Sequence, residues 1–378
     1  MTTITELKKL IDKIPEDQKQ VFDRIFYVSS SIGEVAIPDT CEGLAWQYFG
    51  NKNEHGWNIE KPSSVTKRLE KQKIIRIRNK VTGEEALFNE LRSNRPGMRQ
   101  EDVGVLKKKV LAHIEEARGA CYMCHPEELT ANDVFERIKN EHCITGANIA
   151  KYDAWSGMLY FKTHSPLEFG LEALSNYIDT AFEWFRRVHK QTNKEFEYPF
   201  LMWNCLERAG ASRVHGHMQM LLAKEMAYAE VENLRQASQR YKEENNSANY
   251  FDDLFSVHEA LGLGFERVIA YLTPTKDKEV ILIGKNINEV KELAYKTLRC
   301  FIDRLGVFAF NFVIQMPPLV SHPEWEDFPY VARVVDRGSP LKLGTDIASM
   351  ELYGSKVIGS DPFKVIDEVR KYIAQEQI

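Results

Sequence analysis

No stretch of the 378-residue sequence approaches the roughly 18 consecutive apolar residues of a membrane-spanning helix, so we expect no membrane partner. The N-terminus, MTTITELKKLIDKIPED, lacks the apolar segment of a secretory signal. Only six cysteines are present, which is too few for a disulfide scaffold in a chain of this length. These absences predict a cytoplasmic protein in a reducing compartment, where a close cysteine pair more often holds metal.

An excess of positive charge is absent as well. The formal net charge is −5 and the isoelectric point is about 6.1. A broad basic surface for nucleic acid is therefore disfavoured, whereas a local basic pocket for a phosphorylated small molecule remains compatible with the sequence. Hydrophobic residues make up 43% of the chain, as in an ordinary folded protein of two or three compact units.

The hydrophobic pattern predicts an α+β fold after residue 72. A strand, a long amphipathic helix and a strand occur twice in succession, over 158–204 and over 280–315, which indicates an old duplication. The first of these helices is expected to begin at Ser165-Pro166-x-Glu168, which combines an N-cap, a proline at the first helical position and a capping glutamate. The region 30–70, rich in Gly, Pro, Asn and Ser, is expected to be irregular.

A histidine-rich stretch, Ser212-Arg-Val-His215-Gly-His217-Met-Gln219, is the sharpest feature of the sequence. If it forms a strand, His215, His217 and Gln219 share one face. One interpretation is a half-buried strand whose polar side is solvated. The other is a cleft lined by two imidazoles and an amide, where imidazole can bind metal or attack phosphorus.

Cys121-x-x-Cys124 has the spacing with which two thiolates bind one zinc ion, although a structural site needs four ligands. Two unrelated cysteines and a redox pair are the alternatives. No second pair lies nearby, so the remaining ligands would be distant histidines: His164 and His215 by strand placement, with His125 as a competitor.

Arg92 and Arg95 lie three residues apart before Pro96. Two guanidinium groups at this spacing can bind a pyrophosphate through their planar sets of donors. Taken by themselves, these residues are better explained as a solvated surface pair.

These motifs, in this order, resemble those of galactose-1-phosphate uridylyltransferase and its relatives in the histidine-triad (HIT-like) superfamily, which include diadenosine tetraphosphate phosphorylase and ADP-sugar phosphorylase. The resemblance rests on an opening segment from Arg76 through Asn79 and Thr82-Gly83-Glu84 to Arg92-x-x-Arg95-Pro96, on the Cys-x-x-Cys pair, and on Asn204 eight positions ahead of Ser212. It covers roughly residues 73 to 378.

The resemblance implies a role for each matched residue. Cys121, Cys124, His164 and His215 would hold one structural zinc ion, and His217 would be the nucleophile. Gln219 would support the nucleotidylated histidine, and Ser212 would hydrogen-bond to the leaving phosphate. The expected nucleotide- and phosphate-binding residues are Arg92, Arg95, Asn148 and Asn204.

Several departures from the family pattern matter. Lys80 stands where the family has proline after Asn79, and Glu85 stands where it has tryptophan after Thr-Gly-Glu. Gly216 stands where the family has proline between the two histidines. The strand that carries a second H-x-H in relatives reads Ala309-Phe-Asn311-Phe312 here, so we expect no second metal site.

The fold implied is α+β, with duplicated HIT-like halves built of antiparallel sheets with packed helices. The expected domains are 1–72, an N-terminal extension of unknown fold; 73–235, the half with the zinc site and nucleophile; and 236–378, the half without the H-x-H.

The function implied is a nucleotidyltransferase that moves a nucleoside monophosphate between a nucleotide-sugar and a sugar phosphate, or phosphate, through a covalent nucleotidyl-histidine. A phosphorylase or hydrolase of nucleotide-sugars or dinucleoside polyphosphates is one alternative. A non-catalytic nucleotide-binding protein is another. The partners expected are these small molecules and no nucleic acid, and a homodimer is compatible with the sequence.

Overall fold

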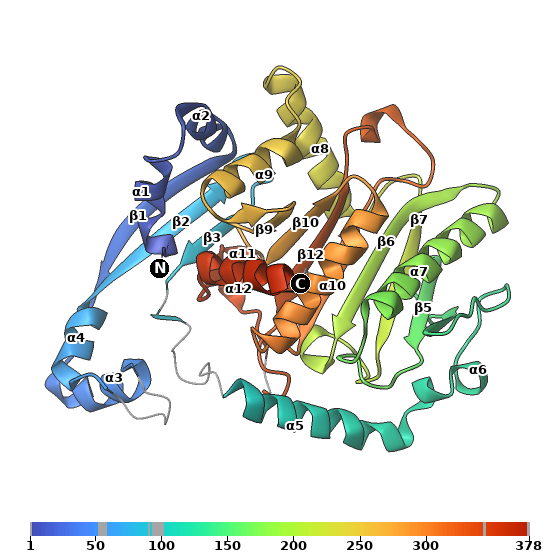
Figure 1. Cartoon of the computed structure of the whole chain (residues 1–378), viewed down its shortest axis with the longest axis horizontal. Helices are drawn as coiled ribbons and strands as arrows, with labels where there is room; N and C mark the ends of the chain where they lie inside the picture. The colour runs from blue at the N-terminus through green and yellow to red at the C-terminus, as the bar shows by residue number, and fades with distance from the viewer. Residues whose placement is uncertain (1, 52–58, 90, 93–101, 343–344, 376–378) are drawn as a thin grey trace.

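The computed structural model describes residues 2–51, 59–89, 91–92, 102–342 and 345–375, and two β-sheets organise them (Figure 1). The helices are α1 Leu7–Ile11, α2 Glu16–Ile25, α3 Glu42–Phe49, α4 Pro62–Glu70, α5 Val103–Glu116, α6 Pro126–Leu129, α7 Leu171–Gln191, α8 Ala229–Glu244, α9 Tyr250–Ala260, α10 Ile287–Asp303, α11 Ser349–Tyr353 and α12 Pro362–Gln375. Within the described ranges, none of them combines the length and apolar character needed to cross a bilayer.

The larger sheet has nine antiparallel strands in the order β4-β5-β7-β6-β11-β12-β10-β9-β8. Its strands are β4 Cys143–Ala147, β5 Trp155–Phe161, β6 Phe196–Cys205, β7 His217–Lys224, β8 Gly264–Phe265, β9 Val268–Ala270, β10 Val280–Gly284, β11 Phe310–Gln315 and β12 Tyr330–Asp336. The two predicted halves meet where β6 pairs with β11, and Asn204 lies opposite Asn311 in that pairing. The expected α+β class with antiparallel sheets and packed helices is confirmed, and the division at residue 235 stays a prediction.

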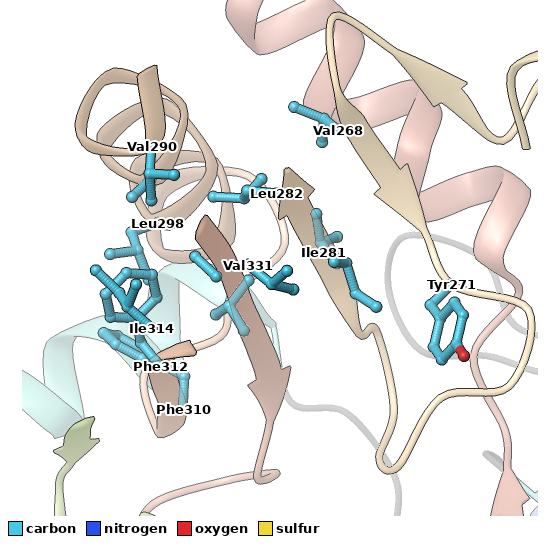
Figure 2. Close-up of a cluster of buried hydrophobic side chains, with 14 of the residues drawn as sticks. Val268, Tyr271, Ile281, Leu282, Val290, Leu298, Phe310, Phe312, Ile314 and Val331 are labelled. Atoms are coloured by element: carbon cyan, nitrogen blue, oxygen red, sulfur yellow. The ribbon is translucent and has the colours of Figure 1, made fainter. Parts of the chain in front are cut away.

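Helices α7 and α10 cover one face of this sheet because both carry a continuous apolar stripe. In Figure 2, Val290 and Leu298 of α10 point toward Phe312 and Ile314 of β11. Side chains alternate along a strand, so Asn311, between buried phenylalanines, lies on the opposite face. That opposite face carries the polar side chains of the site.

The smaller sheet, in the order β1-β2-β3-β13, contains both early and late parts of the chain. Its strands are β1 Phe26–Glu34, β2 Lys71–Asn79, β3 Glu85–Phe88 and β13 Lys356–Ile358, of which β13 runs parallel to β3. The expectation of irregular structure over 30–70 was therefore wrong, since this region contains the end of β1 and helices α3 and α4. Much of β1 is exposed, so its hydrophobic pattern is weak and pairing with β2 defines it.

A network of charged and polar side chains joins the two sheets. Arg333 of β12 donates to Glu279 at 2.5 Å and to Glu84 of the β2–β3 turn at 2.9 Å. Glu84 also accepts from the Tyr271 hydroxyl at 2.5 Å, and the Asn79 amide donates to the same hydroxyl oxygen at 2.9 Å. Two residues of the opening motif, Asn79 and Glu84, thus connect the small sheet to the large one through hydrogen bonds and an ion pair.

Helix α7 begins at Leu171, five residues after the proline at which the sequence predicted its start. Leu167 and Phe169, in the intervening segment, are buried in the core. The Leu167 carbonyl accepts a hydrogen bond from Arg299 of α10 at 2.7 Å. If Leu167 lay in the first turn of α7, its carbonyl would instead accept from a backbone N–H of the same helix. Tertiary packing therefore overrides the local start signal.

Candidate functional site

Two thiols and two imidazoles converge beside the start of β7. Their ligand atoms, from Cys121, Cys124, His164 and His215, all lie within 4.8 Å of one another. Cys124 Sγ is 3.3 Å from His164 Nδ1 and 3.5 Å from His215 Nδ1, and the two Nδ1 atoms are 3.2 Å apart. Tetrahedral zinc with bonds of about 2.3 Å to sulfur and 2.05 Å to nitrogen would set its ligands about 3.6 and 3.3 Å apart. The group is therefore of the right size for one tetrahedral metal ion.

Backbone carbonyls fix which ring nitrogen of His164 and His215 carries a proton. His164 Nε2 lies 2.9 Å from the Ile114 carbonyl oxygen, and His215 Nε2 lies 2.9 Å from that of Phe161. A carbonyl only accepts, so each Nε2 carries the proton and each Nδ1 directs a lone pair at the thiols. Burial lowers the pKa of His215 to about 4, which keeps the ring neutral as a metal ligand must be.

A cation would also change the ionisation of the thiols. Burial, followed by the neighbouring Cys121 thiol, raises the pKa of Cys124 to about 11. A positive ion among the four ligands would stabilise the thiolate that burial disfavours. His125, the competitor proposed from the sequence, is exposed and lies outside the group.

Gly216, between the two histidines, is in close contact with β5. Its N–H donates to the His164 carbonyl at 3.0 Å, and its own carbonyl accepts from the Phe161 N–H at 2.9 Å. A Cβ at this position would lie 2.3 Å from Phe161 Cδ2. Proline, which the resemblance places here, would lack the N–H and collide with this ring.

His217 is the first residue of β7. His215 therefore lies before the strand, whereas the sequence had predicted it within the strand. His217 Nδ1 is 2.8 Å from the His215 carbonyl oxygen and must carry the proton, which leaves a lone pair on Nε2. Burial lowers the pKa of His217, so the ring is neutral near pH 7. A buried, neutral imidazole held in one tautomer is suited to nucleophilic attack.

Two further predicted residues lie beside His217. Gln219 shares its face of β7, is 8% exposed, and has an Oε1 without a hydrogen-bond partner among the described residues. Asn204 lies on the adjacent strand β6, where Met202 pairs with Gln219. Extending that register by two residues sets Asn204 opposite His217.

The remaining predicted residues are less closely grouped. Ser212 is exposed in the loop between β6 and β7. Asn148 follows β4, two strands away from β7 in the sheet order. Arg92 is exposed after β3 of the smaller sheet, and Arg95 lies outside the described residues.

Sequence reasoning missed a set of polar residues next to Asn204. Asn311 Nδ2 donates to Asn204 Oδ1 at 2.7 Å, and Arg337 Nη1 donates to Asn311 Oδ1 at 2.5 Å. Arg337 also lines a cavity of about 610 Å³ whose other cationic residues are Arg208 and Lys342. A polar residue between two phenylalanines of a strand could have marked Asn311 as a candidate site residue. Arg337 lies in a loop, where nothing in the sequence distinguishes it from other arginines.

Comparison with known proteins supports this architecture. No protein-family model matches the sequence, and no curated protein matches it. Among solved structures, ADP-glucose phosphorylase from Arabidopsis thaliana, with bound ADP-glucose, superposes with a TM-score of 0.57 at 15% identity, covering 78% of this chain and 97% of its own. A galt-like protein from Arabidopsis thaliana gives 0.53 at 16% identity over 67% and 92% of the two chains, and a uridylyltransferase gives 0.51 at 13% over 80% and 99%. The chain thus has the fold of these solved structures, and the resemblance read from its motifs is confirmed for the fold.

Proposed function

We propose that the protein is a nucleotidyltransferase that moves a nucleoside monophosphate from a nucleotide-sugar to a sugar phosphate or to phosphate, through a covalent intermediate on His217. The observation that carries this proposal is the 2.8 Å hydrogen bond from His217 Nδ1 to the His215 carbonyl. This bond places the ring proton on Nδ1, and burial keeps the ring neutral, so the Nε2 lone pair is available, which is the state required for attack on phosphorus.

The reaction divides into two displacements. His217 Nε2 attacks the α-phosphorus of the donor, a nitrogen–phosphorus bond forms, and the bond from phosphorus to the bridging oxygen breaks, so that the sugar phosphate leaves with the electron pair. An oxygen of the acceptor phosphate then attacks the same phosphorus and releases His217. The Gln219 amide, whose Oε1 is unpartnered in the described structure, and the Ser212 hydroxyl would hydrogen-bond to the phosphoryl and leaving groups.

Charge on the phosphates needs cationic neighbours. Arg92 and Arg95 remain the residues proposed for the nucleotide, with Asn148 and Asn204 as polar contacts. Arg208 and Lys342 line the 610 Å³ cavity and would bring positive charge close to a phosphorylated acceptor bound there.

We also propose one structural zinc ion, held by Cys121, Cys124, His164 and His215. With four protein ligands it would have no open position, so no step of the reaction passes through it. When bound, it would brace the segment that ends in the His215 carbonyl and thereby the tautomer of His217.

The test is covalent labelling with UDP-glucose and ADP-glucose carrying ³²P at the α-phosphorus. We expect acid-labile label on His217 from one donor, and none in the His217→Asn variant, whose turnover should fall by orders of magnitude while fold and metal content persist. Release of label by phosphate alone would identify a phosphorylase, and release by water a hydrolase. Absence of label with every donor would contradict the proposed mechanism and favour a nucleotide-binding protein. Unchanged turnover in His217→Asn would show that the reaction does not pass through this histidine.

A further inference from the structure

A row of polar side chains crosses the open face of the large sheet at the level of His217. Asn204 of β6 lies directly opposite Asn311 of β11. Extending the β6–β7 register by two residues beyond the Met202–Gln219 pair sets Asn204 beside His217 on its other side. Asn311 in turn contacts Arg337, in the segment that follows β12. The row therefore connects the nucleophile's strand with a residue three strands away.

Arg337 and the Ala209 carbonyl, which both contact Asn311, determine the direction of each hydrogen bond in this row. A guanidinium only donates, so Asn311 must present Oδ1 to Arg337. The Ala209 carbonyl only accepts, and it lies 2.8 Å from Asn311 Nδ2. Asn311 Nδ2 therefore also faces Asn204, whose side chain must present Oδ1 to receive it at 2.7 Å. It follows that Asn204 directs its amide N–H groups away from Asn311.

Arg337 is itself held firmly. Its Nε and Nη2 donate to the two carboxylate oxygens of Asp346 at 2.7 and 2.8 Å, and Lys276 Nζ lies 3.6 Å from the same carboxylate. Burial alone would raise the pKa of Asp346, but the hydrogen bonds from Arg337 and the charge of Lys276 outweigh it and hold the pKa at about 2. The pair is thus ionised at any ordinary pH and fixes the guanidinium in a single orientation.

We propose that Asn311 and Arg337 are positioning residues that make Asn204 a hydrogen-bond donor toward the phosphoryl group transferred by His217. This inference rests on the proposed function. A donor held in advance at that point stabilises the charge that grows on a phosphoryl oxygen during transfer. If the side-chain amide of Asn204 were flipped by 180°, it would present Oδ1 to the same negative group and oppose the reaction.

The variant Asn311→Asp tests this with almost no change of shape. A carboxylate has no N–H, so Asn204 would have to turn its own N–H groups toward the new carboxylate and present Oδ1 to the phosphoryl group. We expect the single-turnover rate of His217 labelling to fall by about 10²-fold, as for the loss of an oriented donor elsewhere. Arg337→Lys, which keeps a donor for Asn311, should retain most of the rate.

A double-mutant cycle separates positioning from other effects. If Asn311 acts through Asn204, Asn311→Asp should cause little further loss in an Asn204→Ala background. A general effect of added negative charge would instead persist in that background, raise the donor KM and weaken with salt. Asn286→Asp, the same chemical change at the exposed N-cap of α10, is the matched control and should leave the labelling rate unchanged.

The outcomes distinguish the two levels of the argument. A wild-type labelling rate in Asn311→Asp, or additive losses in the cycle, would overturn the positioning role and leave the proposed function intact. No labelling of the wild-type protein by any donor would overturn the proposed function and this inference with it.

Discussion

His164 and His215 face each other through Nδ1 atoms 3.2 Å apart, and neither ring can turn without losing a hydrogen bond from Nε2 to a backbone carbonyl. Two lone pairs directed at one point repel unless a cation lies between them. The surrounding chain therefore holds these rings in an arrangement that metal binding would make favourable.

We expect the purified protein to contain one zinc ion per chain. Cys124→Ser should lose the metal and lower the melting temperature, because a hydroxyl is a poor ligand at neutral pH. The matched control is His125→Asn, which alters an exposed neighbour outside the group and should keep both properties. Metal analysis that finds zinc in Cys124→Ser, or a second stoichiometric ion in the wild type, would refute this assignment.

Gly216→Ala should destabilise the protein by about 1–3 kcal/mol, because the added methyl group would lie 2.3 Å from Phe161 Cδ2. The Phe161 ring is stacked on Tyr177, with centroids 3.8 Å apart, and has little room to move. In urea unfolding, Phe161→Leu should offset part of that loss, so the two changes should be non-additive. Strict additivity would mean that the ring and the glycine do not compete for space.

Arg333→Met should cost about 3–5 kcal/mol of unfolding free energy, since it leaves two carboxylates near each other without their cation. Glu279 is 1% exposed in its side chain, and Glu84 is 24% exposed. Adding Glu279→Gln and Glu84→Gln to this variant should recover part of the loss. A cost below about 1 kcal/mol for Arg333→Met would show that this network does not hold the sheets together.

Stability should fall as the pH drops from about 6.5 to 4 because of His258. Burial lowers the pKa of this ring to about 4, and its Nε2 accepts from the Leu272 N–H at 3.3 Å. In the unfolded chain the ring titrates near 6.5, so in this window the unfolded state binds a proton that the native state excludes. The unfolding free energy is not reduced by this effect above pH 6.5, and it decreases by about 3 kcal/mol by pH 4.

Urea unfolding of His258→Met across pH 4–7 isolates this contribution, because the other titrating groups are shared with the wild type. The variant should show a smaller decline in unfolding free energy over the window. Parallel pH profiles for the two proteins would contradict a neutral buried ring at this position.

The parts of the structure that the sequence predicted are those with a local signal. Strand β10 was predicted over its observed range, Val280–Gly284, because its apolar run ends at clear boundaries. The four proposed zinc ligands do converge. The Cys-x-x-Cys spacing indicated the two thiols, and strand placement together with the resemblance indicated the two histidines.

The parts that the sequence did not predict depend on partners far along the chain. Strand β1 is defined by its pairing with β2, whose residues lie 37 positions away where Glu34 faces Lys71 and 53 positions away where Phe26 faces Asn79. The polar row beside Asn204 needs Asn311 and Arg337, which no spacing rule connects to it. The start of α7 was misplaced because a contact from Arg299, on another helix, decides it.

The pairing of β13 with β3 has a consequence for how the protein is made. Lys356 lies opposite Ala86 in that pairing, so about 270 residues separate the two strands along the chain. At about 5–20 residues per second, the ribosome needs roughly 13–55 s to add them. Throughout that time one edge of β3 lacks its neighbour, and its backbone amides are open to any other extended segment. The early sheet is therefore the part of the nascent chain where a chaperone would have most to protect.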